Sequence, residues 1–258
     1  MNKQEQMIEF WSKRANQYKN DPRANTNDIW LRELEIKYIN QIISKNSFNS
    51  ILDFGCANGY TTTKLFKLNP SLTITGIDIN KEMIELAKNN IDESMEGKLN
   101  YLVKDLLNKG KISEKYDFIY CVRAIQNIES QEKQKNITNI LIEMLNDGGK
   151  LLYIESYEKY YELLNKDREE LGLEGLPIHK HLTLLDEEFD SYVSSKLQFI
   201  SETFLASSYY LVTRLLYSKM AKENQEKIDY THQIHEIASK LPQIGNYGPL
   251  KAMLFQKK

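Results

Sequence analysis

The feature that most constrains this chain is a repeated alternation of short apolar runs, which favour strands, with segments of helical periodicity. Repeated units of this length favour a parallel, doubly wound sheet whose ligands bind at the carboxyl ends of the strands. The composition of residues 146–149, Asn-Asp-Gly-Gly, predicts a tight turn before the fifth strand. The expected strands are residues 50–54, 72–78, 99–103, 116–122, 150–155, 199–205 and 250–256, with helices at 59–68, 80–91 and 130–145.

Helical segments precede and interrupt this alternation. Residues 3–19 and 28–44 carry apolar side chains at helical spacing, and Asn27 or Asp28 can cap the second of these helices. Residues 157–198 are polar and helix-prone, and we interpret them as an insertion that covers the site. Further helices are expected at about 206–223 and 226–240. The sequence predicts one α/β domain with a mainly parallel seven-stranded sheet, divided into an N-terminal helical lid (1–45), a core (46–156), a helical insertion (157–198) and terminal strands with a second insertion (199–258).

Composition and charge argue against several classes of protein. The 258 residues, 41% of them hydrophobic, suffice for one sizeable core. A net charge of −2, with no basic arm interleaved with aromatic residues, predicts no nucleic-acid partner. No apolar run approaches the roughly 20 residues of a membrane span, and the first residues lack the pattern of a secretion signal. Cys56 and Cys121 match no metal spacing, so we expect a reduced, cytoplasmic protein of undefined oligomeric state.

The segment from Ser50 to Leu68 passes from an apolar run through a glycine turn into a helix-prone stretch. The turn holds Gly55 and Gly59 in Gly-x-x-x-Gly spacing. Glycines let the backbone approach a ligand where a Cβ would collide. A turn between a strand and a helix presents backbone N–H groups to a nucleotide-like ligand. The further glycine of the dinucleotide fingerprint is missing.

Acidic residues stand at the ends of the first three expected strands, namely Asp53, Asp78 and Asp105. A carboxylate is acceptor-only and can take two donors, so Asp78 can accept hydrogen bonds from both hydroxyls of a ribose. Asp105 is placed to reach the amino group of an adenine. A single aspartate at a strand end is more often a turn or cap residue. Three aspartates in register with a glycine turn indicate a ligand-binding site at the carboxyl ends of these strands.

With these motifs the chain resembles the class I S-adenosylmethionine-dependent methyltransferases. Residues 51–59 look like the first motif of that family, although Ala57 stands where a glycine is common. Residues 76–79 look like its acidic ribose-binding motif, and Lys104-Asp105-Leu106 like its adenine-contacting motif. Residues 116–128 are similar to its fourth strand and loop, and 148–150 to the turn before the fifth. The resemblance covers roughly 48–156 and thins elsewhere to a likeness to methyltransferases of surface-polysaccharide gene clusters. A helical stretch before the last strand departs from the family's terminal hairpin.

The resemblance implies S-adenosylmethionine as cofactor, lying across the strand ends. Its methionine part is expected near Gly55–Gly59, its ribose at Asp78 and its adenine near Asp105. Arg14 and Tyr18 could close over the methionine carboxylate, since a guanidinium is permanently charged and bidentate; a surface arginine and a packed tyrosine are the alternative. The expected cofactor-binding residues are Arg14, Tyr18, Asp53, Gly55, Cys56, Ala57, Gly59, Asp78, Ile79, Met83, Asp105, Leu106, Val122 and Arg123.

Methyl transfer from a sulfonium mainly requires an aligned acceptor and the exclusion of water. A sugar hydroxyl also needs a general base, whereas a phosphate, carboxylate or amine does not. His179 is the first candidate base, because imidazole titrates near neutrality, and Glu155 is the second, although it could equally cap the next helix. His-x-His at 179–181 lacks a further metal ligand, so no metal is expected. The expected substrate-side residues are Asn127, Asn165, Arg168, His181, Tyr209, Tyr210 and Arg214; Tyr210 and Arg214 share a helical face and could hold an anionic group.

The leading hypothesis is O-methylation of a small molecule, either a sugar or a phosphorylated or acidic metabolite. The loop after the fourth strand lacks the Asn/Asp-Pro-Pro-Tyr/Phe motif of amino-group methyltransferases, and Cys121 lacks the Pro-Cys context of cytosine methyltransferases. A nicotinamide-dependent oxidoreductase is the first alternative, but it needs the missing glycine. A non-catalytic binding protein with a methyltransferase fold is the second, because fold does not fix function.

Overall fold

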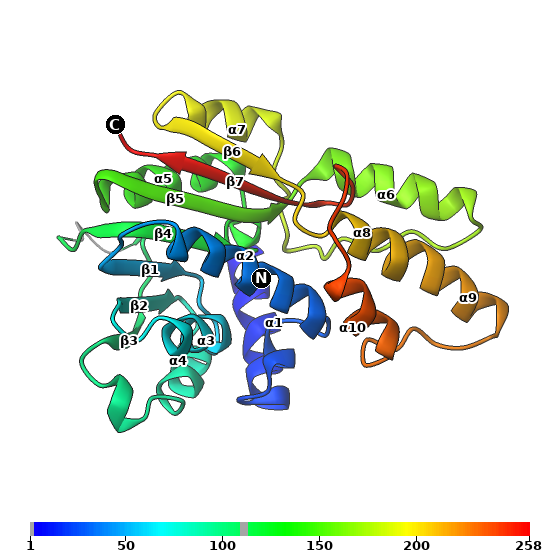
Figure 1. Ribbon diagram of the computed structural model, residues 1–258, viewed down its shortest axis with the longest axis horizontal. Helices are drawn as coiled ribbons and strands as arrows, with labels where there is room; N and C mark the ends of the chain where they lie inside the picture. Colours follow the sequence, from blue (N-terminus) through cyan, green and yellow to red (C-terminus); the bar gives the residue numbers. More distant parts are fainter. Residues whose placement is uncertain (1–2, 109–112) are drawn as a thin grey trace.

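A seven-stranded sheet forms the centre of the fold in the computed structural model, which describes residues 3–108 and 113–258 (Figure 1). Residues 1–2 of the expected lid lie outside the described residues. The strand order is β3-β2-β1-β4-β5-β7-β6, in which β7 is antiparallel to both of its neighbours and the other pairs are parallel. This confirms the mainly parallel seven-stranded sheet. The strands are β1 Ser50–Phe54, β2 Thr73–Asp78, β3 Leu99–Val103, β4 Tyr116–Val122, β5 Leu145–Ser156, β6 Gln198–Thr203 and β7 Leu250–Gln256.

Helices cover both faces of the sheet, and the side-chain alternation of the strands explains why. Ile51 and Phe118 pack into the core under α2 and α3, while the next residues, Leu52 and Ile119, pack under α5 and α7; all four are fully buried. Strands apolar on both faces require this two-sided cover. The helices are α1 Lys3–Tyr18, α2 Ile29–Ser44, α3 Tyr60–Leu68, α4 Lys81–Lys88, α5 Gln131–Glu143, α6 Glu158–Glu170, α7 Glu187–Ser194, α8 Ser207–Tyr210, α9 Tyr217–Glu223 and α10 Gln233–Lys240, with short 3₁₀ turns η1 Pro22–Ala24, η2 Glu93–Met95 and η3 Ile125–Asn127.

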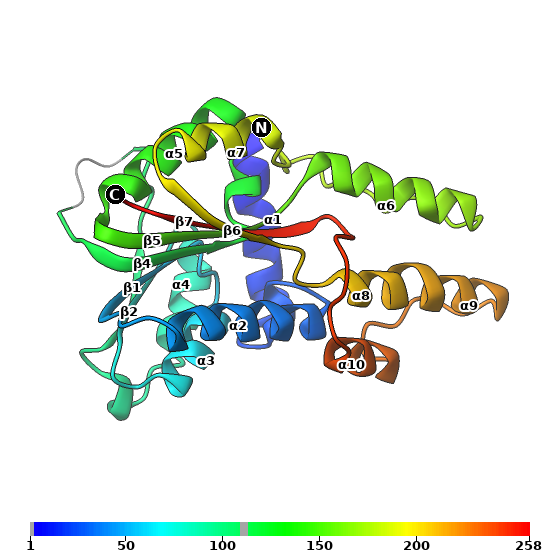
Figure 2. The same ribbon diagram turned by 45° about the horizontal axis from the view of Figure 1, so that its top comes forward.

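Two groups of helices define the region beyond the strand ends. The N-terminal helix α1 stands across the carboxyl ends of the parallel strands (Figure 2). A helical arm, formed by α6 and α8–α10, extends beyond the sheet, with α6 alongside the α8–α9 segment (Figures 1 and 2). The expected insertion at 157–198 is therefore divided, because α6 belongs to the arm whereas α7 packs on the sheet.

The expected helix at 206–223 is interrupted by a π-helical segment, η4, Leu211–Leu216. A π-turn leaves carbonyl groups without their usual partners. Here the guanidinium of Arg168 donates to the carbonyl of Arg214 and to Ser218 Oγ. The expected helix at 226–240 begins only at Gln233. There the side chain of His232 caps the helix by accepting the Ile234 N–H.

The expected turn at 146–149 is instead a bulge inside β5. Tyr116 pairs with Leu145 and Phe118 with Lys150, so four residues of β5 lie opposite one residue of β4. Gly148 has a φ of +74° and donates its N–H to the carbonyl of Lys257. The N–H of Lys257 in turn donates to the carbonyl of Gly149. Pairing with the end of β7 therefore keeps the glycines within the sheet.

Gly59 is the last residue of the glycine turn and the N-cap of α3. A substitution at Gly59 tests how tightly this turn is packed. Its φ is +73°, and a Cβ there would lie 2.6 Å from the Tyr101 hydroxyl oxygen and 2.9 Å from the Ala87 Cβ. We expect Gly59→Ala to lower the free energy of unfolding by about 3 kcal/mol, combining left-handed strain with overpacking. Gly97 has a similar φ of +76° but open space around it, so Gly97→Ala should cost only about 1–2 kcal/mol of strain. Urea denaturation measures both; equal losses would show that Tyr101 and Ala87 yield to the added methyl group.

Candidate active site

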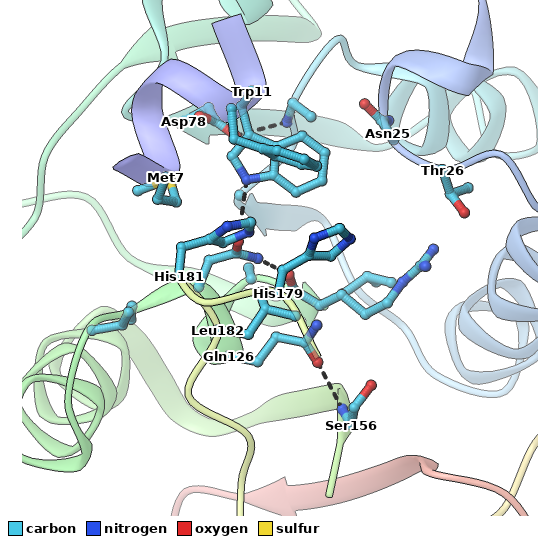
Figure 3. A pocket seen from close by; sticks show the side chains of 18 of the residues that line it. Met7, Trp11, Asn25, Thr26, Asp78, Gln126, Ser156, His179, His181 and Leu182 are labelled. Carbon is cyan, nitrogen blue, oxygen red and sulfur yellow. Dashed lines mark hydrogen bonds between the residues drawn. The ribbon is translucent and has the colours of Figure 1, made fainter. Parts of the chain in front are cut away.

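A cavity of about 510 Å³ lies at the carboxyl ends of β1, β2 and β4. It is bounded by α1, by residues 25–28, by residues 176–184 and by the start of the helical arm (Figure 3). Its volume is in the range of small-molecule binding sites. The cavity lies at the edge of the sheet where the sequence predicts ligand binding.

Asp78 and the glycine turn form one wall of this cavity. One oxygen of Asp78, which is labelled in Figure 3, accepts the N–H of Ala57 at 2.9 Å, and the other accepts the N–H of Asn80, which the figure does not draw, at 2.8 Å. Burial raises the pKa of Asp78, while these N–H groups oppose the rise. Gly55 and Ala57 have φ values of +79° and +47°, so the backbone of the turn curves around the carboxylate. A carboxylate has about four acceptor sites, so Asp78 can still accept a further donor.

The other two strand-end aspartates differ in their surroundings. Asp53 is 3% exposed and accepts the hydroxyls of Thr62 at 2.6 Å and Tyr120 at 2.8 Å, and burial raises its pKa to about 6. It therefore holds the start of α3 against β4 at the base of the cavity. Asp105 is half-buried and accepts the Leu107 N–H at 3.0 Å. The cavity wall on this side also contains Ile79, Met83 and Leu106.

Buried polar atoms without partners test whether a polar ligand fits this half of the cavity. Thr61 Oγ1 and Asn25 Oδ1 are buried, have no hydrogen-bond partner among the described residues, and belong to residues that line the cavity. Buried polar groups are normally paired, so these atoms indicate a polar ligand. Together with the Asp78 carboxylate and the glycine turn, they fit a nucleoside that carries a polar amino-acid tail.

Most expected cofactor residues line the cavity, but three behave differently. Arg14 lines it, yet its Nε donates to the Ala24 carbonyl at 3.0 Å and its Nη2 to Asn27 Oδ1 at 3.0 Å, so it holds the 23–27 loop over the cavity. The structure places Tyr18 outside the cavity wall, with its ring packed against the guanidinium of Arg14. Gly59 lies beneath the turn against Tyr101. The residues that do line the cavity are Asp53, Gly55, Cys56, Ala57, Asp78, Ile79, Met83, Asp105, Leu106, Val122 and Arg123.

Aromatic and histidine side chains close the cavity beneath α1. His179 and His181 stack at 5.6 Å between ring centroids, and Phe10 of α1 lies 5.2 Å and 4.8 Å from them (Figure 3). The indole N–H of Trp11 donates to Asn127 Oδ1 at 3.1 Å. Burial, followed by the charge of His179, lowers the pKa of His181. The expected substrate-side residues Asn127 and His181 and the candidate base His179 are thus brought together.

The structure does not support Glu155 as the base. Glu155 is fully buried, is absent from the cavity wall, and accepts the N–H groups of Ala124 at 2.9 Å, Ile125 at 2.9 Å and Gln126 at 3.2 Å. Burial raises its pKa to about 7, and these three N–H bonds oppose the rise. Glu155 therefore fixes the turn after β4 by capping η3. This differs from both expectations for Glu155, which were a catalytic base and a cap of the helix after β5.

Three expected substrate residues also lie outside the cavity wall. Asn165 exchanges hydrogen bonds with the backbone of Leu176, at 3.1 and 2.7 Å. Arg168 donates to the Glu174 carbonyl at 2.9 Å as well as to the π-helical segment. Tyr209 donates to Asp28 and lies 2.9 Å from His235 Nδ1. Their hydrogen bonds are made within the protein, so these side chains organise the helical arm rather than contact a substrate.

Sequence reasoning missed a buried charged group on α2. Arg32 lines the cavity, and Glu35 accepts its Nη1 at 3.0 Å and the Nη2 of Arg123 at 3.2 Å. Tyr210 and Arg214 also line the cavity, as expected, and Arg214 is ion-paired with Asp28. The signal in the sequence was a scarce arginine beside Leu31, on the apolar side of a helix whose one other cation, Lys37, is exposed.

Metal and membrane sites are not found in the part of the chain that the structure describes. There, no three or more histidine, cysteine, aspartate or glutamate side chains gather as a metal would require. None of the helices at 3–108 or 113–258 combines the length and apolarity needed to cross a bilayer.

The sheet order, with its antiparallel β7 between β5 and β6, and the cavity at the strand ends define the α/β fold of the class I methyltransferases. The family model for a methyltransferase domain matches residues 45–238. The chain belongs to this family and is an S-adenosylmethionine-dependent methyltransferase.

Comparisons with individual proteins agree with this assignment. The chain is 34% identical over 121 residues to malonyl-[acyl-carrier protein] O-methyltransferase 1 of Ilyobacter polytropus, covering 46% of this chain and 42% of that protein. A malonyl-[acyl-carrier protein] O-methyltransferase of Priestia megaterium is 31% identical over 144 residues, covering 52% and 49%. The chain thus spans about half or less of the length of these relatives. The N-methyltransferase NodS of Bradyrhizobium japonicum, solved with S-adenosylhomocysteine, shares the fold with a TM-score of 0.61 at 14% identity, covering 100% of this chain and 99% of that one.

Proposed function

We propose that this methyltransferase transfers the methyl group to a carboxylate oxygen of a small organic acid. The observation that carries the proposal is a set of three arginines in the cavity wall. Arg123 follows β4, Arg214 belongs to the helical arm and Arg32 to α2, and all three line the cavity. Arg32 and Arg123 share a single carboxylate partner, Glu35. Cations that are partly buried in a cavity wall attract an anionic acceptor, because screening by solvent is weaker there than at an exposed surface.

The residues at the carboxyl ends of β1, β2 and β3 would hold the cofactor. Asp78 would accept the ribose hydroxyls, the Gly55–Ala57 turn would surround the methionine part, and Asp105 with Leu106 would contact the adenine. S-Adenosylmethionine supplies an activated methyl group, which needs no acid or base from the protein. The protein's contribution is alignment of the acceptor and exclusion of water. The Trp11–Asn127 hydrogen bond and the packing of Phe10 on His179 and His181 hold α1 closed over the cavity.

A carboxylate acceptor also agrees with the surroundings of the candidate bases. A carboxylic acid is ionised at neutral pH and needs no proton removed before it accepts a methyl group. Glu155 is held by three backbone N–H groups and does not reach the cavity. His179 is exposed and packs against Phe10. The names of the malonyl-[acyl-carrier protein] O-methyltransferase relatives describe methylation on oxygen, which supports this acceptor chemistry.

The stability of the product to alkali tests the proposal. The enzyme is incubated with S-adenosylmethionine labelled in its methyl group and with small carboxylic acids, their amides and simple sugars. A methyl ester releases labelled methanol in mild alkali, whereas an N-methyl group or a methyl ether does not. We expect alkali-labile label from the acids alone, and His179→Ala should retain that activity. Alkali-stable label, or loss of activity in His179→Ala with the cofactor still bound, would contradict a base-free transfer to carboxylate.

A further inference from the structure

We propose that Arg32 and Arg123 form a clamp for the carboxylate of the acceptor, positioned by Glu35. The inference rests on the proposed function and assigns that function a binding subsite. The two arginines come from distant parts of the chain, one from α2 and one from the residue after β4. Both line the cavity, whereas Glu35 is fully buried behind them.

Two guanidinium groups share one ion-pair partner here. Glu35 Oε2 accepts Arg32 Nη1 at 3.0 Å and Arg123 Nη2 at 3.2 Å. A second carboxylate, Asp53, lies within electrostatic reach of Arg32, but its hydrogen bonds go to Thr62 and Tyr120. Burial lowers the pKa of Arg32 to about 10, which still leaves it charged at neutral pH. An additional anion could therefore pair with both guanidinium groups.

Unsatisfied donors indicate the same ligand. Arg32 Nε and Arg123 Nε are buried and have no hydrogen-bond partner among the described residues. A buried donor left unpaired destabilises the structure. A small rotation of each guanidinium would turn a free edge into the cavity, where a carboxylate could bind both forks. An uncharged acceptor could pair with these donors only through weaker, neutral oxygens.

The backbone at Arg123 is held in a conformation that side chains rarely adopt. Its φ is +52°, in the left-handed region that is unfavourable for a residue with a Cβ. The Arg123 N–H donates to the Ile154 carbonyl at 2.8 Å, and its carbonyl accepts the Asn127 side-chain amide at 2.6 Å. Strain that the surroundings maintain is characteristic of binding sites. Here it fixes the origin of the Arg123 side chain at the cavity.

The position of the clamp favours the acceptor over the methionine tail of the cofactor as the source of the carboxylate. Asp78 and Asp105 follow β2 and β3, on one side of β1, whereas Arg123 follows β4, on the other side. Tyr210 of the helical arm lies within electrostatic reach of Arg123 and Glu35. The clamp therefore lies between the expected cofactor site and the arm.

Malonate is a simple probe of this clamp. Titration calorimetry on the full chain saturated with S-adenosylhomocysteine compares malonate with uncharged dimethyl malonate. We expect malonate alone to bind, and Arg32→Gln and Arg123→Gln each to weaken its binding by about tenfold or more, as loss of a charge-assisted pair implies. Arg23→Gln is the matched control, since Arg23 is an exposed arginine paired with Asp21 outside the cavity wall. Arg123→Lys, which retains the charge, should keep part of the affinity even if Arg123→Gln folds poorly.

Two results would overturn the clamp. Unchanged malonate binding in both glutamine variants would remove the role of the arginines. Weaker binding of S-adenosylhomocysteine to these variants, with malonate binding retained, would assign the arginines to the methionine carboxylate. The proposed function fails separately: malonate binding that needs both arginines, with only alkali-stable methylated products, supports the clamp and contradicts ester formation. Alkali-labile products formed at the wild-type rate by both variants contradict the clamp alone.

Discussion

Asp78→Ala should weaken the binding of S-adenosylhomocysteine by about a hundredfold, which is the largest loss of ligand affinity we expect from one substitution. The substitution removes a carboxylate that faces the cavity and could accept two ribose hydroxyls. It also releases the N–H groups of Ala57 and Asn80, which the carboxylate now fixes. Titration calorimetry measures the change in affinity directly.

Asp78→Asn separates these two effects. Asparagine has the same shape and keeps one acceptor oxygen, so it should lose only about tenfold in affinity. Thermal unfolding without ligand identifies any variant that loses affinity through loss of folding. If both variants fold and bind S-adenosylhomocysteine as the wild type does, Asp78 is not the ribose ligand.

The sheet could be predicted from the sequence because short apolar runs alternate with segments of helical periodicity, a pattern typical of a doubly wound parallel sheet. Residues 50–54, 99–103, 116–122 and 250–256 have the predicted boundaries, and β2 and β6 differ by one or two residues at an end, so β5 is the exception. That exception has a physical cause, since the glycines at 148–149 pair with Lys257 at the end of the last strand. The π-helical segment likewise contacts a residue distant in sequence, Arg168.

The two halves of the site differ in how far the sequence could predict them. Parallel strands end at one edge, so strand-end residues such as Asp78 and Asp105 must lie near each other, and both line the cavity. The other half comes from helices, where spacing shows which residues share a face but not which face turns inward. Arg168 and Tyr209 therefore proved to support the arm, while Arg32 was missed.

Asp28 connects the N-terminal segment to the helical arm, so its loss should cause the largest loss of stability. It caps α2, as expected, by accepting the Leu31 N–H at 3.1 Å, and it also accepts Tyr209 and pairs with buried Arg214. Removing one partner of a buried pair leaves the other charge uncompensated, so Asp28→Ala should lower the free energy of unfolding by about 4 kcal/mol. Urea denaturation at neutral pH measures this loss. Asp147→Ala is the control and should change stability by less than about 0.5 kcal/mol. The Asp147 side chain is 92% exposed, and its Oδ1 lies 3.7 Å from Lys257 Nζ, which makes a weak surface ion pair.

The pH dependence of this loss tests whether the charge of Asp28 is its cause. Burial alone would raise the pKa of Asp28, but Arg214 and the hydrogen bonds from Tyr209, Arg214 and Leu31 hold it below its ordinary value of 3.8. A carboxylate with a lowered pKa stabilises the folded state above its unfolded pKa, and this contribution is lost as the pH falls through the folded pKa. The stability difference between wild type and Asp28→Ala should therefore be constant above about pH 5 and shrink below pH 3.8. A difference that persists undiminished in acid would mean that Asp28 acts through its shape and neutral hydrogen bonds, and not through its pairing with Arg214.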